Sequence, residues 1–425
     1  VRKDSPEGTD RELTATEVQA SIAVQREFLS SDVEIEELLE GFTPDDLVEP
    51  GPSWDTPRGD KSEVEVGLRP RWETWVGKTG GMTALLYAAR EGQVEAAEAI
   101  LAGGADIDQV SGDGSSPLLL ALLNGRFDLT MRLIEHGADP NLATHTDGVS
   151  PLFAVLQTQW SLRFTYQPQP RAQDNQKTEH MVVLNALLEA GADPNVRLNT
   201  HLWHWEWEGK MGLDITGATP FWRAAFALDM EAMKVLAAYG ADPSIPTKWD
   251  EIGMRASRQE DGRTGDDSGL SPLPENTPNM YPIHAAAGGG WLGFIAIDMN
   301  QVPNNFINAV KYLVEEHGAD VNVRNSWGYT PLHYAAARGD DDLIEYLVSR
   351  GADLKAISRL GQSTVDMARG GGAGYHYRAA FPETVNLLLS LGAEFRCIDT
   401  HFRGTGAYCA GSGVPRFEAI VTPEP

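Results

Sequence analysis

The stretch Thr330–Asp353, TPLHYAAARGDDDLIEYLVSRGAD, decides the fold. A threonine caps a helix by accepting a backbone N–H, and the proline after it suits the first helical turn, where no N–H is needed. An alanine-rich run follows, and Gly339 lies in a turn that reverses the chain. Apolar residues then recur at helical spacing, namely Leu343, Ile344, Leu347 and Val348. Gly351 predicts a left-handed stop, so the stretch predicts two short helices.

The ending of this stretch recurs along the chain. A Gly-Ala-Asp triplet starts at Gly104, Gly137, Gly191, Gly240, Gly318 and Gly351, and a Gly-Ala-Glu copy starts at Gly392. The intervals from Gly104 to Gly137 and from Gly318 to Gly351 are both 33 residues, and the others are longer. A fixed period with interruptions is the signature of a repeat architecture that carries insertions.

A matching start precedes each triplet. It is a capping residue, followed in most copies by proline and then by a helix rich in alanine or leucine. The starts lie at Thr83, Ser116, Ser150, Thr219, Tyr281, Thr330 and, in a degenerate form, Thr364. Alanine pairs in these helices allow neighbouring helices to approach closely.

With both signatures present, the chain resembles the ankyrin repeat family over about residues 80 to 396, and Thr330–Asp353 is nearly the family consensus. The resemblance implies an all-α solenoid of about seven stacked helix pairs with projecting hairpin turns. It also implies a non-catalytic scaffold that binds proteins through the hairpin tips and the concave inner helices. The motif Thr219–Ala225 and a Trp-rich insert resemble longer members encoded in bacteria, which implies further repeats upstream of residue 1.

The sequence divides into three regions: an acidic N-terminal extension and linker (1–70), the repeat array (71–396) and a loop-rich C-terminal tail (397–425). Val1 is not a methionine, and we expect a processed form or a piece of a longer chain. Insertions interrupt the array at about 157–179, 198–215, 247–279 and 290–305. Such insertions map to loops, which often bind.

One insert is rich in aromatic residues. Trp203, Trp205 and Trp207 alternate with other residues, which predicts a strand with the three indoles on one face. Trp160, Phe164 and Tyr166, in the preceding insert, are expected to pack beside them. Two interpretations stay open, because large aromatic side chains either form a local core that anchors the loop or contact a ligand.

Charge and hydropathy exclude several classes of function. Asp plus Glu number 61 against 34 Lys plus Arg, a net charge of −27, which predicts no binding to nucleic acid. No run of eighteen apolar residues occurs, so we expect no membrane insertion.

Catalytic and metal motifs are absent from the sequence, and we predict no enzyme activity, no metal and no cofactor. His201 and His204 are three residues apart, and on a strand they would face opposite sides. His284 and His333 occupy the Thr-Pro-Leu-His position, where the resemblance implies hydrogen bonds within and between repeats. The run Gly370–Gly372 lacks the context of a phosphate-binding loop and predicts an ordinary loop.

The candidate partner-binding residues are exposed aromatic side chains in hairpin turns and in the Trp-rich insert. They are Trp203, Trp205, Trp207, His145, Trp249, Trp327 and Tyr329. For Trp327 and Tyr329, packing on a neighbouring turn is an equal alternative. A glycan or small-ligand module built on Trp203–Trp207, with or without enzymatic activity, is the alternative function.

Cys397 and Cys409 are close together near the C-terminus. The glycines between them allow the loop to bend back, and we expect a disulfide. A disulfide would place the protein in the periplasm or outside the cell, whereas two free thiols would fit the cytoplasm.

Overall fold

The structure is a computed structural model of the whole chain. It describes residues 80–161, 171–200, 202, 215–248, 278–289, 301–359, 362–370 and 380–396, and the backbone of four short strands. Trp203, Trp205, Trp207, Trp249, Cys397 and Cys409 lie outside the described residues, as do His201 and His204.

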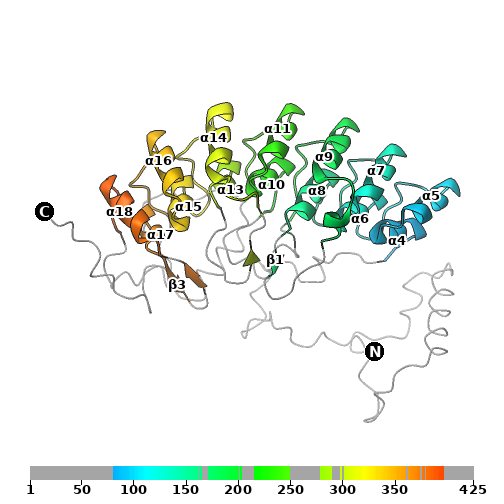
Figure 1. Ribbon diagram of the computed structural model, residues 1–425, viewed down its shortest axis with the longest axis horizontal. Helices are drawn as coiled ribbons and strands as arrows, with labels where there is room; N and C mark the ends of the chain where they lie inside the picture. Colours follow the sequence, from blue (N-terminus) through cyan, green and yellow to red (C-terminus); the bar gives the residue numbers. More distant parts are fainter. Residues whose placement is uncertain are drawn as a thin grey trace, which may run out of the picture. The chain divides into compact units, whose positions relative to one another are not determined.

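The described residues of the array form seven helix pairs, which follow one another along its length (Figure 1). The first helices of the pairs are α4 (Ala84–Glu91), α6 (Pro117–Leu123), α8 (Pro151–Gln159), α10 (Pro220–Phe226), α13 (Pro282–Ala286), α15 (Pro331–Arg338) and α17 (Thr364–Ala368). Their partners are α5 (Val94–Ala102), α7 (Phe127–Glu135), α9 (His180–Glu189), α11 (Met230–Ala238), α14 (Phe306–His317), α16 (Asp341–Ser349) and α18 (Pro382–Ser390). First helices, called inner below, pack on the inner helices of adjacent repeats, and the outer helices form a second row. This arrangement confirms the predicted all-α solenoid of seven helix pairs.

Side chains cap the inner helices as their sequences predict. Thr83, Ser116, Ser150 and Thr219 each accept the backbone N–H three residues later, at 3.1–3.3 Å. In the repeat that starts at Thr330, His333 Nδ1 accepts the Thr330 N–H at 3.1 Å. Thr364 is the one start placed a residue late, because Ser363 is the cap of α17.

The glycine of every triplet is left-handed. The seven φ angles run from +66° to +98°, a region that side chains with a Cβ rarely adopt. No atom would lie within 4 Å of a Cβ at any of these glycines. The backbone angle alone, and not crowding, therefore requires glycine there.

A ladder of asparagine side chains ties consecutive triplets together. Asn141 Nδ2 donates to the carbonyl of Gly191 at 3.0 Å, and its Oδ1 accepts the N–H of Asp193 at 2.8 Å. Asn195 repeats both bonds toward Gly240 and Asp242. Asn322 does the same toward Gly351 and Asp353. At these three junctions, the asparagine four residues after one triplet glycine thus sets the spacing to the next repeat.

Two small sheets add to the helices. β1 (Arg163–Phe164) pairs antiparallel with β2 (Ile297–Asp298), and β3 (Gly371–Ala373) pairs antiparallel with β4 (His376–Arg378). The expectation of an ordinary loop at Gly370–Gly372 is therefore wrong, since Gly371 and Gly372 belong to a strand whose partner follows within a few residues. β1 and β2 come from different repeats, and they join the inserts of repeats three and five.

Candidate functional site

The turn between α10 and α11, in repeat four, is where two inserts meet the array. Ala227, Leu228 and Asp229 connect the helices and are all buried. Leu228 has a φ of +58°, which is unfavourable for leucine and needs support from its surroundings. The support comes from repeat three on one side and repeat five on the other.

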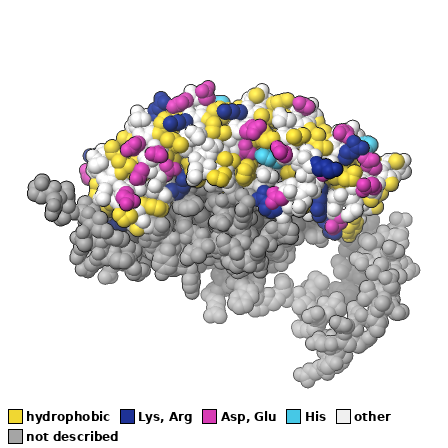
Figure 2. All heavy atoms as spheres, in the orientation of Figure 1, with side chains coloured by type: hydrophobic (Ala, Val, Ile, Leu, Met, Phe, Trp, Pro, Cys, Tyr) yellow, Lys and Arg dark blue, Asp and Glu magenta, His cyan; other side chains and the backbone are white. Residues whose placement is uncertain are grey.

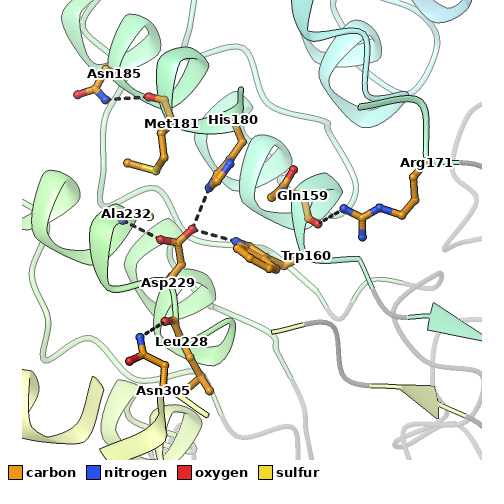
Figure 3. Close-up of polar contacts among 10 residues, drawn as sticks. All are labelled: Gln159, Trp160, Arg171, His180, Met181, Asn185, Leu228, Asp229, Ala232 and Asn305. Atoms are coloured by element: carbon orange, nitrogen blue, oxygen red, sulfur yellow. Dashed lines mark hydrogen bonds and ion pairs between the residues drawn. The ribbon is translucent and has the colours of Figure 1, made fainter. Parts of the chain in front are cut away.

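On the side of repeat three, the Asp229 carboxylate gathers three donors (Figure 3). Trp160 Nε1 donates to Oδ2 at 2.9 Å, and His180 Nε2 lies 3.0 Å from the same oxygen. Oδ1 accepts the N–H of Ala232 at 3.0 Å and so caps α11. Burial opposes ionisation of Asp229, but the bonds from His180, Ala232 and Trp160 outweigh burial and lower the pKa of the carboxyl. The group is therefore a carboxylate at neutral pH.

A buried arginine strengthens the same side. Arg223, on α10, is fully buried; its Nε donates to Gln157 Oε1 at 2.7 Å and its Nη2 donates to the carbonyl of Trp160 at 2.6 Å. Burial lowers its pKa to about 9, and the nearby Asp229 charge opposes that shift. Arg223 thus stays charged at neutral pH and fixes the last turn of α8, where the repeat-three insert begins.

On the side of repeat five, three bonds reach backbone carbonyls of the turn. Gln301 Nε2 donates to Phe226 at 2.5 Å, the N–H of Val302 donates to Ala227 at 2.9 Å, and Asn305 Nδ2 donates to Leu228 at 2.9 Å. These donors are Gln301, Val302 and Asn305, the last residues before α14. The end of the repeat-five insert is therefore fixed to repeat four, and β1–β2 pairing links it to the repeat-three insert.

The two inserts in the hairpin turns, 198–215 and 247–279, each begin and end at or near residues whose backbones are hydrogen-bonded to each other. We call each such pair of ends the base of the insert. Leu198 exchanges backbone bonds with Ala218 and Gly217, at 3.0 and 2.9 Å. Thr247 pairs in the same way with Met280 and Asn279, both at 2.9 Å. Arg197 joins the two bases, because its Nε donates to the carbonyl of Gly217 at 2.8 Å and its Nη2 donates to that of Pro246 at 2.5 Å.

The cluster around Asp229 joins side chains of repeats three and four. His180 and Trp160 meet edge to face, with ring centroids 5.8 Å apart, and both point at the carboxylate (Figure 3). In the part of the chain that the structure describes, no group of three or more His, Cys, Asp or Glu side chains could hold a metal ion.

Among the described helices, none is long and apolar enough to cross a membrane.

Three candidate partner-binding residues lie in described hairpin turns. His145 is exposed, and its N–H donates to the carbonyl of Asp113 in the preceding turn at 2.9 Å. Trp327 is partly buried against the core. Tyr329 is buried, and its hydroxyl donates to Gln362 Oε1 at 2.6 Å. Tyr329 therefore packs on the neighbouring turn and is not an exposed contact, and the structure does not bring these three residues into one site.

The histidines of the Thr-Pro-Leu-His position bridge adjacent repeats, as expected. His284 Nδ1 accepts the N–H of Tyr281 at 3.1 Å, and its Nε2 lies 3.0 Å from the carbonyl of Val323. His333 Nε2 lies 3.3 Å from the carbonyl of Gln362. Burial lowers the pKa of His284 to about 4 and that of His333 to about 3, so both rings are neutral.

The sequence interpretation missed the roles of His180, Arg223 and Asp229. A signal was present for Arg223, because it is a charged residue in an inner helix whose equivalent in the repeat that starts at Thr330 is Tyr334. His180 and Asp229 are 49 residues apart in the sequence, and no local pattern connects them.

Comparison with known proteins places these features in a family. A family model described as ankyrin repeats (3 copies) matches residues 68–158 and 270–358. Human rabankyrin-5 is 26% identical over 269 residues, which cover 59% of this chain and 20% of that protein. Mouse protein phosphatase 1 regulatory subunit 27 is 41% identical over 61 residues, which cover 14% of this chain and 39% of that protein. The chain thus spans well under two thirds of either relative.

Two further proteins are similar to this chain. Alpha-latrocrustotoxin-Lt1a of Latrodectus tredecimguttatus is 44% identical over 59 residues, which cover 14% of this chain and 4% of that protein. A crystal structure of the human ASB11 ankyrin repeat domain aligns with 74% of this chain and 99% of its own, at 22% identity and a TM-score of 0.43. The relatives named here come from animals, and the resemblance to bacterial members stays a prediction. The segments that the family model matches contain α4 to α7, all of α8 but its last residue, and α13 to α16, so sequence and helix pairs agree that these segments are ankyrin repeats.

Proposed function

We propose that this chain is a non-catalytic scaffold that binds a protein partner, and that the inserts around repeat four set the choice of partner. The observation that carries the proposal is that all four inserts adjoin this one repeat. Two leave from the hairpin bases that Arg197 joins, and two are fixed to the α10–α11 turn. Four inserts that adjoin one repeat distinguish it from the plain repeats.

Inserts whose ends are already held by the array should bind a partner more tightly than unanchored loops. A loop that must order itself on binding costs free energy for each immobilised side chain, and anchoring it beforehand lowers that cost. The described anchors are buried and apolar, since Leu198, Leu202 and Ile215 are at most 1% exposed. They support the proposal that Trp203, Trp205 and Trp207, between them in sequence, are held ready to contact a partner.

Related proteins support a protein partner rather than another ligand. Ankyrin repeats are in general protein-interaction modules, and one relative is named as a regulatory subunit of protein phosphatase 1. A subunit of that kind works through another protein. We infer the same mode for this chain, with contacts from the hairpin turns, the inner-helix face and the Trp-rich insert.

The test compares capture by the full chain and by the double variant Trp205→Ala/Trp207→Ala. Proteins bound from native lysate are quantified by mass spectrometry, with Tyr87→Ala, an exposed aromatic on α4, as the matched control. We expect the double variant to lose the enriched partner while keeping its melting temperature, and the control to keep the partner. A sharp fall in melting temperature with normal capture would show instead that the insert is a structural anchor.

The alternative, a glycan or small-ligand module on Trp203–Trp207, is separated by fluorescence. Indole emission of the full chain should respond to added glycans or divalent cations only under the alternative. A response that disappears in Trp205→Ala/Trp207→Ala would replace the scaffold proposal.

A further inference from the structure

The inner helices have one face that points away from the outer row, and the first two repeats show it open. In repeat one, Tyr87 and Arg90 follow the cap Thr83 by four and seven residues, lie one turn apart on that face and are both exposed. In repeat two, which has neighbours on both sides, the equivalent Leu120 and Leu123 are partly exposed. Stacking against two neighbouring repeats therefore leaves this surface, which we call the inner-helix face, open to solvent.

From repeat three onward, the same two positions are buried in every repeat. They are Ala154 and Gln157 in α8, Arg223 and Phe226 in α10, Ala285 and Gly288 in α13, Tyr334 and Ala337 in α15, and Met367 and Gly370 in α17. None of the eight side chains in this set other than glycine is more than 6% exposed. The outer row, in contrast, presents charged side chains of both signs at its surface (Figure 2). Something besides the neighbouring repeats therefore covers the inner-helix face from repeat three.

A strand pair spans repeat four on that side of the array. β1 follows α8 and β2 follows α13, and α10 packs between these two helices, so the β1–β2 pairing joins repeats three and five across α10. In Figure 1, β1 lies on the side of the array that carries the inner helices. Gln301 and Val302, just after β2, bond to the carbonyls of Phe226 and Ala227 at the end of α10. We call β1, β2 and these two residues the β1–β2 strap.

The polar groups of the covered face are paired with each other. Arg223 stands at the position where Tyr87 is exposed in repeat one, yet its guanidinium bonds to Gln157 Oε1 and to the carbonyl of Trp160. Gln157 is itself the other polar side chain of the face in repeats three to five. A buried charge is costly unless it finds such partners, so these residues fit a closed face better than one that faces water.

Repeats six and seven are closed as well. There a second strand pair, β3–β4, follows the end of α17, and the N–H of Phe381 after it donates to the carbonyl of Ala368 at 2.9 Å. A short antiparallel pair after an inner helix thus accompanies closure at both places.

We propose that the β1–β2 strap closes the inner-helix face of repeats three to five against a binding partner. With the strap in place, a partner at these repeats contacts the inserts and not the helices beneath them. Within the described part of the array, the inner-helix face stays open at repeats one and two only. The consequence for a partner rests on the proposed scaffold function, whereas the closure is a property of the chain by itself.

Cysteine labelling measures the closure. Ala154→Cys in α8 and Ala285→Cys in α13 place a thiol four residues after the cap on the closed face, and Leu120→Cys places one at the same position on the open face of α6. Each full-chain variant is treated with a maleimide, and mass spectrometry reads the labelled peptides separately from those of Cys397 and Cys409. Because a buried thiol reacts only after local opening, we expect the two closed positions to react at least about tenfold more slowly than Leu120→Cys.

Opening the strap should expose the same positions. Arg163→Pro/Phe164→Pro removes both N–H groups that the two-residue strand β1 can donate, and Arg163→Ala/Phe164→Ala, which keeps them, is the matched control. We expect the proline pair to speed labelling of Ala154→Cys and Ala285→Cys at least about threefold more than the alanine pair does. Labelling of Leu120→Cys should not change with either pair.

Equal labelling of closed and open positions in the full chain would overturn the proposal, as would closed positions that stay protected in the proline pair. If the proline pair also speeds labelling of Leu120→Cys, the array has opened as a whole, and Gln301→Ala then carries the test because it removes only the bond to Phe226. That variant should speed labelling of the closed positions about threefold, and unchanged rates would overturn the proposal. Trp205→Ala/Trp207→Ala should leave every rate unchanged, so the closure is tested separately from the proposed function.

Discussion

Replacing Asp229 with alanine tests whether repeat four is the anchor of the inserts. The variant removes the α11 cap, worth about 1 kcal/mol, and the acceptor for Trp160 and His180. Hydrogen bonds to a charged group contribute about 1.5–3 kcal/mol each. Arg223, which is fully buried, also loses the nearby negative charge that opposes the lowering of its pKa. Because the contributions of the cap and of the two side-chain bonds overlap, we expect a total loss of about 3–5 kcal/mol.

The control is Asp340→Ala. Asp340 caps α16 through the N–H of Leu343 at 3.1 Å and pairs with Arg338 at 3.1 Å, but its side chain is 19% exposed against 6% for Asp229. Solvent screens the control pair, so we expect a loss of about 1–2 kcal/mol there.

The assay is urea unfolding followed by circular dichroism, with hydrogen exchange read at the α10–α11 turn. Repeat arrays can unfold in stages, and the exchange data assign the loss to repeat four. Asp229→Ala should speed exchange there and in the first turn of α11. Equal losses for Asp229→Ala and Asp340→Ala would refute the anchoring role of the carboxylate.

Three further predictions follow from the local chemistry. Gly351→Val should lower the free energy of unfolding by more than about 1 kcal/mol, because Gly351 has a φ of +87°, and Gly351→Asn should lower it by less. An unchanged urea midpoint for Gly351→Val would show that the left-handed conformation does not require glycine. The free energy of unfolding should fall as pH drops from about 6.5 toward 4, because the histidines bind protons in the unfolded chain while His284 and His333 stay neutral in the folded one. Each histidine should lower this free energy by about 1.4 kcal/mol per pH unit, and equal urea midpoints at pH values of about 7.5 and 5.5 would contradict this. Cys397 and Cys409 should resist alkylation without reductant, as a disulfide in an oxidising compartment would, and two alkylated cysteines would exclude it.

The repeats could be predicted because their determinants are local. The interactions that define a repeat join residues close in sequence or one repeat apart. Examples are the helix cap at Thr219, the left-handed helix end at Gly240 and the contacts of His333. A sequence pattern therefore contains nearly all the information about them.

The insert anchors could not be predicted, because they join residues that no period relates. Trp160 and Asp229 are 69 residues apart, and β1 pairs with β2 across the whole of repeat four. The same limit applies to Tyr329, whose burial depends on Gln362, 33 residues later in the next hairpin turn. Whether an aromatic side chain in a turn is exposed is decided by its neighbour rather than by its own sequence.

We propose that a protein partner contacts the inserts around repeat four. The decisive measurement is hydrogen exchange of the full chain with and without its captured partner. We expect protection to appear at 198–215 and 247–279 and at the α10–α11 turn, while exchange in α4 to α7 stays unchanged. Protection confined to the regular hairpin turns around Trp327, with none at the inserts, would contradict it.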